Sequence, residues 1–183
     1  MDLEISFLAD RPEALETVAR WIHTQWGSTF GVSLEQMASG FQRRCHRDRV
    51  PFTLVGEFNG KLVGTSTVVA CDLPAWRDLY PWLAAVYVDP SHRGKGIGSE
   101  LVRAACHHAT SLGNENLYLY TETAAPFYEQ LGWRTLEKRM YHSDEVTVMA
   151  SALANWGPGP DAECVAMQLL RTHACRSRHV SGS

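Results

Sequence analysis

The segment with the clearest chemical potential is a glycine-rich stretch in the middle of the chain. It consists of Arg93, Gly94, Lys95, Gly96, Ile97 and Gly98, followed by Ser99. Three alternate glycines let the backbone turn tightly and leave its N–H groups uncovered by side chains. The stretch lies between a predicted strand and a predicted helix, so these groups would converge at the positive end of the helix dipole. Together with the two flanking cations, this predicts an anion site suited to a pyrophosphate.

Two common phosphate-binding motifs do not fit this stretch. A Walker loop requires Gly-Lys followed by Ser or Thr, whereas Gly96 follows Lys95 here. A dinucleotide fingerprint, G-x-G-x-x-G, would need a glycine at Ser99, and it usually stands near the first strand of its fold. The remaining pattern is R-x-x-G-x-G, which Arg93, Gly96 and Gly98 form.

The first half of the chain is expected to supply a strand, two helices and a hairpin. Residues 3–8 are typical of a short strand, and the spacing of Asp10 and Glu13 predicts a capping box at the start of the first helix. Ser33 and Gln36 repeat that spacing before the second helix. Asn59-Gly60 joins two β-rich runs, 52–58 and 61–70, which indicates a tight hairpin.

The second half is expected to contain the parallel unit around the glycine-rich stretch. A buried strand over 82–88 leads into a helix over about 98–112, and a strand over 116–121 follows. Such a strand–helix–strand unit is right-handed in nearly all proteins. A short helix over about 123–131 and two final strands complete the order β-α-α-β-β-β-α-β-α-β-β, which predicts a mixed sheet with helices on its faces.

Composition excludes several broad classes of function. The chain has 183 residues, with 17 Lys and Arg against 20 Asp and Glu, which gives a net charge of −3. This balance argues against a nucleic-acid binder, and no apolar run approaches the length of a transmembrane helix. The five cysteines are scattered and the acidic N-terminus is unlike a signal peptide. We therefore expect a cytoplasmic protein with reduced thiols, no metal site and no membrane partner.

Two sequence blocks resemble the GNAT superfamily of acetyl-CoA-dependent N-acetyltransferases. VYVDPSHRGKGIGSELV (86–102) is similar to the family's acyl-CoA-binding motif A, and AAPFYEQLGW (124–133) to its motif B. The resemblance covers about residues 3–150. It implies an α/β GNAT fold with a mixed, mostly antiparallel sheet of about seven strands, split in a V between strands 82–88 and 116–121. The domain is expected over 1–154, with residues 155–183 as an extension of a possible short helix and a disordered tail.

The resemblance also implies roles for individual residues. The donor would be acetyl-CoA, whose pantetheine arm would bind the backbone of Val86, Tyr87 and Val88, while the stretch from Arg93 to Ser99 holds the pyrophosphate. Thr121 stands where the family often has an asparagine that contacts pantetheine. Tyr128 matches the family's frequent general acid, which would protonate the departing thiolate.

The general base is not determined by the resemblance. An attacking amine must lose a proton, and many members of the family use a carboxylate, which strand 82–88 lacks. Asp72, in the loop after the hairpin, and Glu122, after strand 116–121, are the candidates. We rank Asp72 first because its loop is expected to border the acceptor cleft, where Trp76 and Tyr80 could also line a pocket.

The predicted function is transfer of an acetyl group from acetyl-CoA to a primary amine by direct attack in a ternary complex. The acceptor could be a small molecule, a peptide N-terminus or a lysine, and the protein a monomer or homodimer. A non-catalytic acyl-CoA-binding module is the main alternative, and a dinucleotide-binding oxidoreductase is a weaker one. A cluster of arginines after the second helix is either a solvated face or a docking site for an acidic acceptor: Arg43, Arg44, Arg47 and Arg49.

Overall fold

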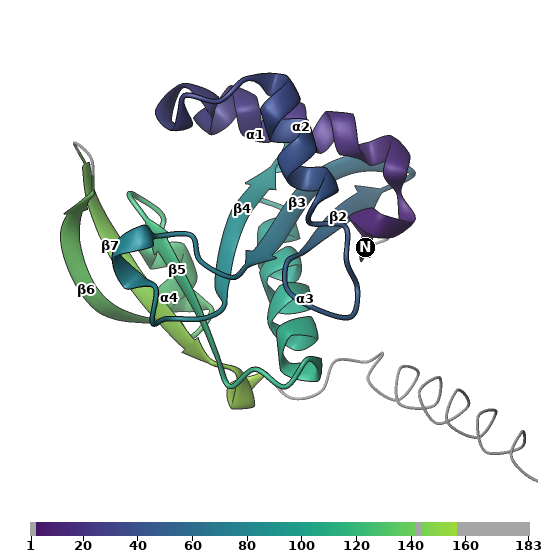
Figure 1. The fold of residues 1–183 in the computed structure, drawn as a ribbon. Coiled ribbons are helices and arrows are strands. Elements are labelled where there is room, and N and C mark those ends of the chain that lie inside the picture. The colour runs from purple at the N-terminus through teal and green to yellow at the C-terminus, as the bar shows by residue number, and fades with distance from the viewer. Residues whose placement is uncertain (1–2, 142–143, 157–183) are drawn as a thin grey trace, which may run out of the picture.

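The computed structural model describes residues 3–141 and 144–156, and its elements follow the predicted order (Figure 1). The strands are β1 (Leu3–Phe7), β2 (Phe52–Phe58), β3 (Lys61–Val69), β4 (Trp82–Val88), β5 (Asn116–Thr121), β6 (Arg134–Tyr141) and β7 (Asp144–Ala152). The helices are α1 (Leu15–Phe30), α2 (Leu34–Gln42), α3 (Ile97–Ser111) and α4 (Ala125–Gln130). Of the predicted extension 155–183, all but Asn155 and Trp156 lies outside the described residues.

The strands form one seven-stranded sheet in the order β1-β2-β3-β4-β5-β7-β6. All neighbouring strands are antiparallel except β4 and β5, which are parallel. The predicted mixed, mostly antiparallel sheet is therefore confirmed. At the hairpin between β2 and β3, Asn59 and Gly60 have φ of 51° and 72°, the left-handed conformation that this turn requires.

Helices cover both faces of the sheet (Figure 1). On one face, α3 inserts Val102, Ala105 and Ala109 into a core with side chains of β2, β4, β5 and β7. On the other face, α1 and α2 pack over β2 through Val18, Phe41 and their neighbours. The central sheet is thus buried from both sides, which matches its largely apolar strands.

The two predicted capping boxes have different outcomes. Before α2, the Ser33 hydroxyl accepts the Gln36 N–H at 3.2 Å and the Gln36 side chain accepts the Ser33 N–H at 2.8 Å, as predicted. The prediction for Asp10 and Glu13 is wrong. Arg11 Nε donates a hydrogen bond to the Glu13 carboxylate at 2.6 Å, and Asp10 forms an ion pair with Arg47. The chain therefore makes two 3₁₀ turns, and α1 begins at Leu15 without a side-chain cap.

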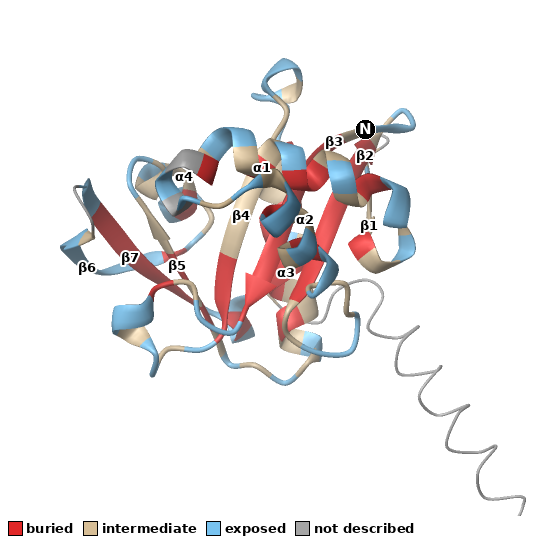
Figure 2. Ribbon diagram, turned by 45° about the horizontal axis from the view of Figure 1, so that its top comes forward, coloured by how far each residue is buried: buried red, intermediate tan, exposed pale blue. Residues whose placement is uncertain are grey.

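The parallel strands β4 and β5 separate soon after they meet. Both strands are described throughout, and their ladder contains a single pair, Trp82 with Tyr118. Beyond Leu83, β4 changes from buried to half-buried (Figure 2). The strand also carries a bulge opposite Ser66, where Ala85 adopts a φ of 49°. The predicted V between these strands is therefore present. The bulge also leaves part of the β4 backbone without a partner in the β3–β4 ladder.

Two features are absent from the described residues. None of the helices in 3–141 and 144–156 has the length and apolar character to cross a membrane. In the same ranges, no three His, Cys, Asp or Glu side chains come close enough together to hold a metal ion. The expected absence of a metal therefore stays a prediction.

Gly64 sets the separation between β3 and β4. A Cβ added there would lie 2.6 Å from the Tyr87 carbonyl oxygen and 2.8 Å from the Leu101 side chain. We expect Gly64→Ala to lower the free energy of unfolding by about 1–3 kcal/mol, because the strands must shift to relieve the overlap. Gly40→Ala, in α2, is the control, since nothing lies within 4 Å and alanine favours a helix by about 0.5–1 kcal/mol. Urea unfolding measures both, and equal effects would contradict this account.

Candidate functional site

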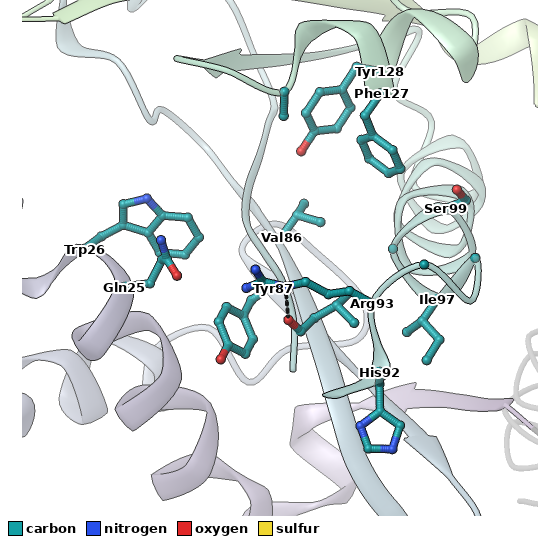
Figure 3. A pocket seen from close by; sticks show the side chains of 15 residues that line it. Gln25, Trp26, Val86, Tyr87, His92, Arg93, Ile97, Ser99, Phe127 and Tyr128 are labelled. Atoms are coloured by element: carbon teal, nitrogen blue, oxygen red, sulfur yellow. Dashed lines mark hydrogen bonds between the residues drawn. The ribbon is translucent and has the colours of Figure 1, made fainter. Parts of the chain in front are cut away.

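A cavity of about 540 Å³ opens where β4 leaves β5 (Figure 3). Its walls come from four elements that are distant in sequence: α1, the second half of β4, the glycine-rich stretch with the start of α3, and α4. The lining residues are Gln25, Trp26, Val86, Tyr87, Val88, His92, Arg93, Gly94, Gly96, Ile97, Gly98, Ser99, Ala124, Phe127 and Tyr128. The fold thus brings together most of the residues predicted to form the site.

The glycine-rich stretch presents an uncapped helix N-terminus to this cavity. Gly94 and Gly96 have φ of 74° and 79°, which any other residue would adopt only with strain. Gly96 is the N-cap of α3, and no side chain accepts a hydrogen bond from the first turn. The N–H groups of the first turn are therefore available to an anion, whose charge the helix dipole favours.

The two cations of the stretch lie apart from one another. Arg93 donates from Nε to the Val88 carbonyl at 3.0 Å, and its guanidinium lies 5.8 Å from the centre of the Tyr87 ring. Figure 3 shows this side chain extending across the cavity toward Gln25 and Trp26. Lys95 does not line the cavity, and its Nζ lies 3.5 Å from the Ser91 carbonyl. Both cations remain close to the predicted anion site, but only Arg93 faces the cavity.

Tyr128 directs its hydroxyl into the cavity from α4, toward Val86 (Figure 3). Its ring packs edge-on against Phe127 and Trp133, with centroids 5.0 and 5.8 Å away, and only 8% of the residue is exposed. Burial raises the pKa of this phenol above its usual value, because the phenolate would lose hydration. Tyr128 therefore stays protonated at neutral pH and can donate a proton but not accept one.

Asp72 follows β3 and does not line the cavity. Its loop is anchored by fully buried Leu73 and by a 2.7 Å hydrogen bond from Trp82 Nε1 to the Leu79 carbonyl. Burial raises the pKa of the Asp72 carboxyl from 3.8 to about 6, although the positive charge of Arg44 opposes the shift. A carboxyl with this pKa is mostly ionised at neutral pH and has more basic strength than an ordinary aspartate.

Asp72 and Tyr128 lie on opposite sides of the separated strands. Tyr128 belongs to the core on the α3 face, together with Leu119 of β5. The next residue of β5, Tyr120, projects to the other face and packs near Ala84 and Trp76. The charge of Asp72 acts on Tyr120 and, with burial, raises the pKa of its phenol. The opening between β4 and β5 therefore has a proton donor on one face and a carboxylate on the other.

Four other residues singled out in the sequence do not line the cavity. The Thr121 hydroxyl accepts the Ala124 N–H at 3.0 Å, which places it at the start of α4 and not on the cavity wall. Glu122 is exposed, as is Tyr80, whereas Trp76 packs in the cluster beside Tyr120.

Five residues of the cavity had no predicted role: His92, Ala124 and Phe127 lie within the two motif blocks, but nothing in the sequence pointed to Gln25 and Trp26. Both lie in the last turns of α1, more than fifty residues before β4. Trp26 is one of six tryptophans, and an aromatic residue on a helix usually belongs to the core. Its position across the sheet depends on tertiary packing, for which the local sequence contains no signal.

Comparison with known proteins identifies the family. The sequence profile of the Acetyltransferase (GNAT) family matches residues 15–133, which is more than half of the chain. This range includes α1, the whole glycine-rich stretch and α4, so the match covers every wall of the cavity. The chain therefore belongs to the GNAT family.

Two curated proteins match shorter segments of the chain. Glucosamine 6-phosphate N-acetyltransferase of Trypanosoma brucei brucei is 43% identical over 56 residues, covering 30% of this chain and 38% of that protein. Human N-acetyltransferase 8B is 32% identical over 92 residues, covering 48% and 40%. The chain thus spans about two fifths of the length of these curated relatives.

The fold itself is matched by solved structures. An aminoglycoside 6'-N-acetyltransferase complexed with coenzyme A superposes with a TM-score of 0.66, covering 82% of this chain and 97% of that one. The two sequences are 17% identical, so this likeness establishes the shared fold alone.

The burial of Asp72 predicts a pH-dependent effect on stability. Because its pKa is higher in the folded than in the unfolded chain, the folded state binds more protons between about pH 4 and 6, and stability falls as pH rises through that range. Asp72→Asn removes the charge, so we expect its Tm to exceed that of the wild type increasingly from pH 4 to pH 7. Thermal unfolding across this range measures the difference. Asp78→Asn, at an exposed position of the same loop, is the control. A constant difference would contradict the assignment.

Proposed function

We propose that this acetyltransferase transfers the acetyl group of acetyl-CoA to a primary amine of a small molecule, by direct attack in a ternary complex. The observation that carries the proposal is the single cavity that joins the uncapped start of α3 to the opening between β4 and β5, with the Tyr128 hydroxyl directed into it. A long ligand with a pyrophosphate at one end and a thioester at the other fits this arrangement.

The donor would be held mainly by backbone. Its pyrophosphate would accept hydrogen bonds from the N–H groups at the start of α3, and its pantetheine arm would extend along Val86, Tyr87 and Val88 in place of the missing β5 neighbour. Backbone groups around the bulge at Ala85 lie beside the position expected for the thioester carbonyl. One such N–H would stabilise the oxyanion that forms when the amine attacks.

Proton transfer would use the two faces of the opening. The neutral amine attacks the carbonyl carbon to form the new C–N bond, and Asp72, directly or through a water molecule, takes the proton that the nitrogen loses. When the C–S bond breaks, Tyr128 donates its proton to the departing sulfur. The Asp72 carboxyl, with a pKa of about 6, is mostly ionised at neutral pH and can take up a proton, and burial keeps Tyr128 in the protonated form that a proton donor needs.

The nature of the acceptor is supported by the relatives as well as by the site. The names of the two curated relatives describe N-acetyltransferases, one of them for glucosamine 6-phosphate. Aromatic side chains beside Asp72, namely Trp76 and Tyr120, would pack against the body of a small acceptor. A cytoplasmic location and a monomeric or homodimeric state stay predictions.

A non-catalytic acyl-CoA-binding module remains the second candidate, because the glycine-rich stretch alone would suffice for it. The buried, protonated Tyr128 favours an enzyme, since binding the donor does not require a phenol at the thioester end. Release of free thiol on addition of an amine distinguishes the two candidates directly.

The binding of acetyl-CoA tests the donor site. We expect acetyl-CoA and CoA at about 100 times their Kd to stabilise the protein by roughly 2.7 kcal/mol in thermal unfolding, whereas NADH and ATP do not. Gly96→Glu should abolish this stabilisation because it places a carboxylate where the pyrophosphate binds. Gly113→Glu is the matched control, since Gly113 also has a positive φ, 82°, but lies at the far end of α3. Unchanged CoA binding by Gly96→Glu would refute the site.

The hydroxyl of Tyr128 can be tested separately from binding. We expect Tyr128→Phe to lower kcat by about ten- to a thousandfold, with little change in the Kd for CoA, because the ring and its packing are retained. Tyr118→Phe, on the opposite side of β5, should leave kcat unchanged. A Tyr128→Phe enzyme with normal kcat would eliminate the general-acid role.

A further inference from the structure

Arg44 differs from the other arginines of its cluster. Arg47 pairs with Asp10, Arg49 lies 3.5 Å from Asp48, and Arg43 is exposed. Arg44 is half-buried just after α2, with its guanidinium 5.1 Å from the centre of the Phe41 ring. Within residues 3–141 and 144–156 it has no ion-pair partner within 4 Å and no side-chain hydrogen bond. The Phe41 ring is the one contact shown for this guanidinium among the described residues, and a cation that has lost hydration without an ion pair or hydrogen bond is costly, so its position requires an explanation.

The carboxylate whose charge acts on Arg44 is Asp72, the proposed general base. The two charges act on one another, yet they form no ion pair within 4 Å, and Asp72 likewise has no hydrogen-bond partner among the described side chains. Arg44 approaches from the end of α2, whereas Asp72 approaches from the loop after β3. Two partly buried, opposite charges from different elements thus interact electrostatically without forming an ion pair within 4 Å.

A ligand with both charges would satisfy this pair. An amine or ammonium group would bind at Asp72, and a carboxylate or phosphate would accept charge-assisted hydrogen bonds from the guanidinium fork. A purely cationic acceptor, such as a polyamine, would meet Asp72 but would be repelled by Arg44. An uncharged acceptor would leave the guanidinium unpaired.

We propose that Arg44 binds the acidic group of the acceptor, so that the preferred substrates are small amines that also carry a carboxylate or a phosphate. The inference rests on the proposed function and narrows its substrate class. Arg44 is here a specificity-determining residue, and it takes no part in forming or breaking the amide and thioester bonds. Trp76 and Tyr120, which pack together beside Asp72, would contact the apolar part of the acceptor.

The experiment compares matched acceptors that differ only in the acidic group. Phenylalanine with phenethylamine tests a carboxylate, and glucosamine 6-phosphate with glucosamine tests a phosphate. The wild type should show at least a tenfold higher kcat/KM for the acidic member of one pair, and the pair that responds identifies the acid.

Arg44→Met should lower kcat/KM for the acidic member about 10- to 100-fold, as expected for lost hydrogen bonds to a charged group. Its kcat/KM for the neutral member should stay within about threefold. Arg43→Met, with the same loss of charge at an exposed position, should change neither.

Two results would overturn the inference while leaving the proposed function intact. The first is a wild type that acetylates both members of each pair equally well. The second is an Arg44→Met enzyme that loses activity equally on both members, with its pH profile displaced to higher pH, because Arg44 would then only modulate the charge of Asp72. If acetyl-CoA stabilised the protein but no amine of either pair released thiol, the proposed function and this inference would both be wrong for small amines.

Discussion

The structure depends on the early separation of two parallel strands. β4 and β5 pair at Trp82 and Tyr118 and then diverge, which interrupts an otherwise continuous seven-stranded sheet. Unpaired backbone in a sheet centre is costly, and in the proposed function the amide groups of pantetheine would take the place of the missing neighbour. Val86, next to the bulge at Ala85, and the turn at Gly96 both line the resulting cavity. The cavity is thus a consequence of strand geometry more than of side-chain shape.

The separation also distributes the chemistry between two environments. On the α3 face, burial among aromatic rings keeps Tyr128 protonated. On the other face, burial raises the pKa of Asp72 only to about 6, because the charge of Arg44 partly offsets the cost of burying the carboxylate. A continuous sheet would keep these groups apart, whereas the opening lets one bound thioester lie between them. In the proposed mechanism, the same interruption would therefore serve both donor binding and proton transfer.

Much of this was predictable from sequence, for physical reasons that differ between elements. The hairpin at Asn59-Gly60 and the cap at Ser33 depend on local backbone chemistry, and both are confirmed. The glycine-rich stretch could be assigned because glycines at that spacing have few other uses. The false capping box at Asp10 shows the limit, since Arg11 and a distant arginine compete for both carboxylates. Trp26 in the cavity wall and the electrostatic interaction of Arg44 with Asp72 arise from tertiary packing, which no local pattern records.

Hydrogen–deuterium exchange with and without CoA tests the central claim most directly, because it reports on backbone groups that the strand separation leaves free. The account predicts that CoA slows exchange at the amides of Val86–Val88 and of the stretch from Gly94 to Ser99, while amides of the edge strand β6 are unaffected. Protection confined to other parts of the sheet, or none at all with CoA at saturation, would contradict the claim that the separated strands bind the donor.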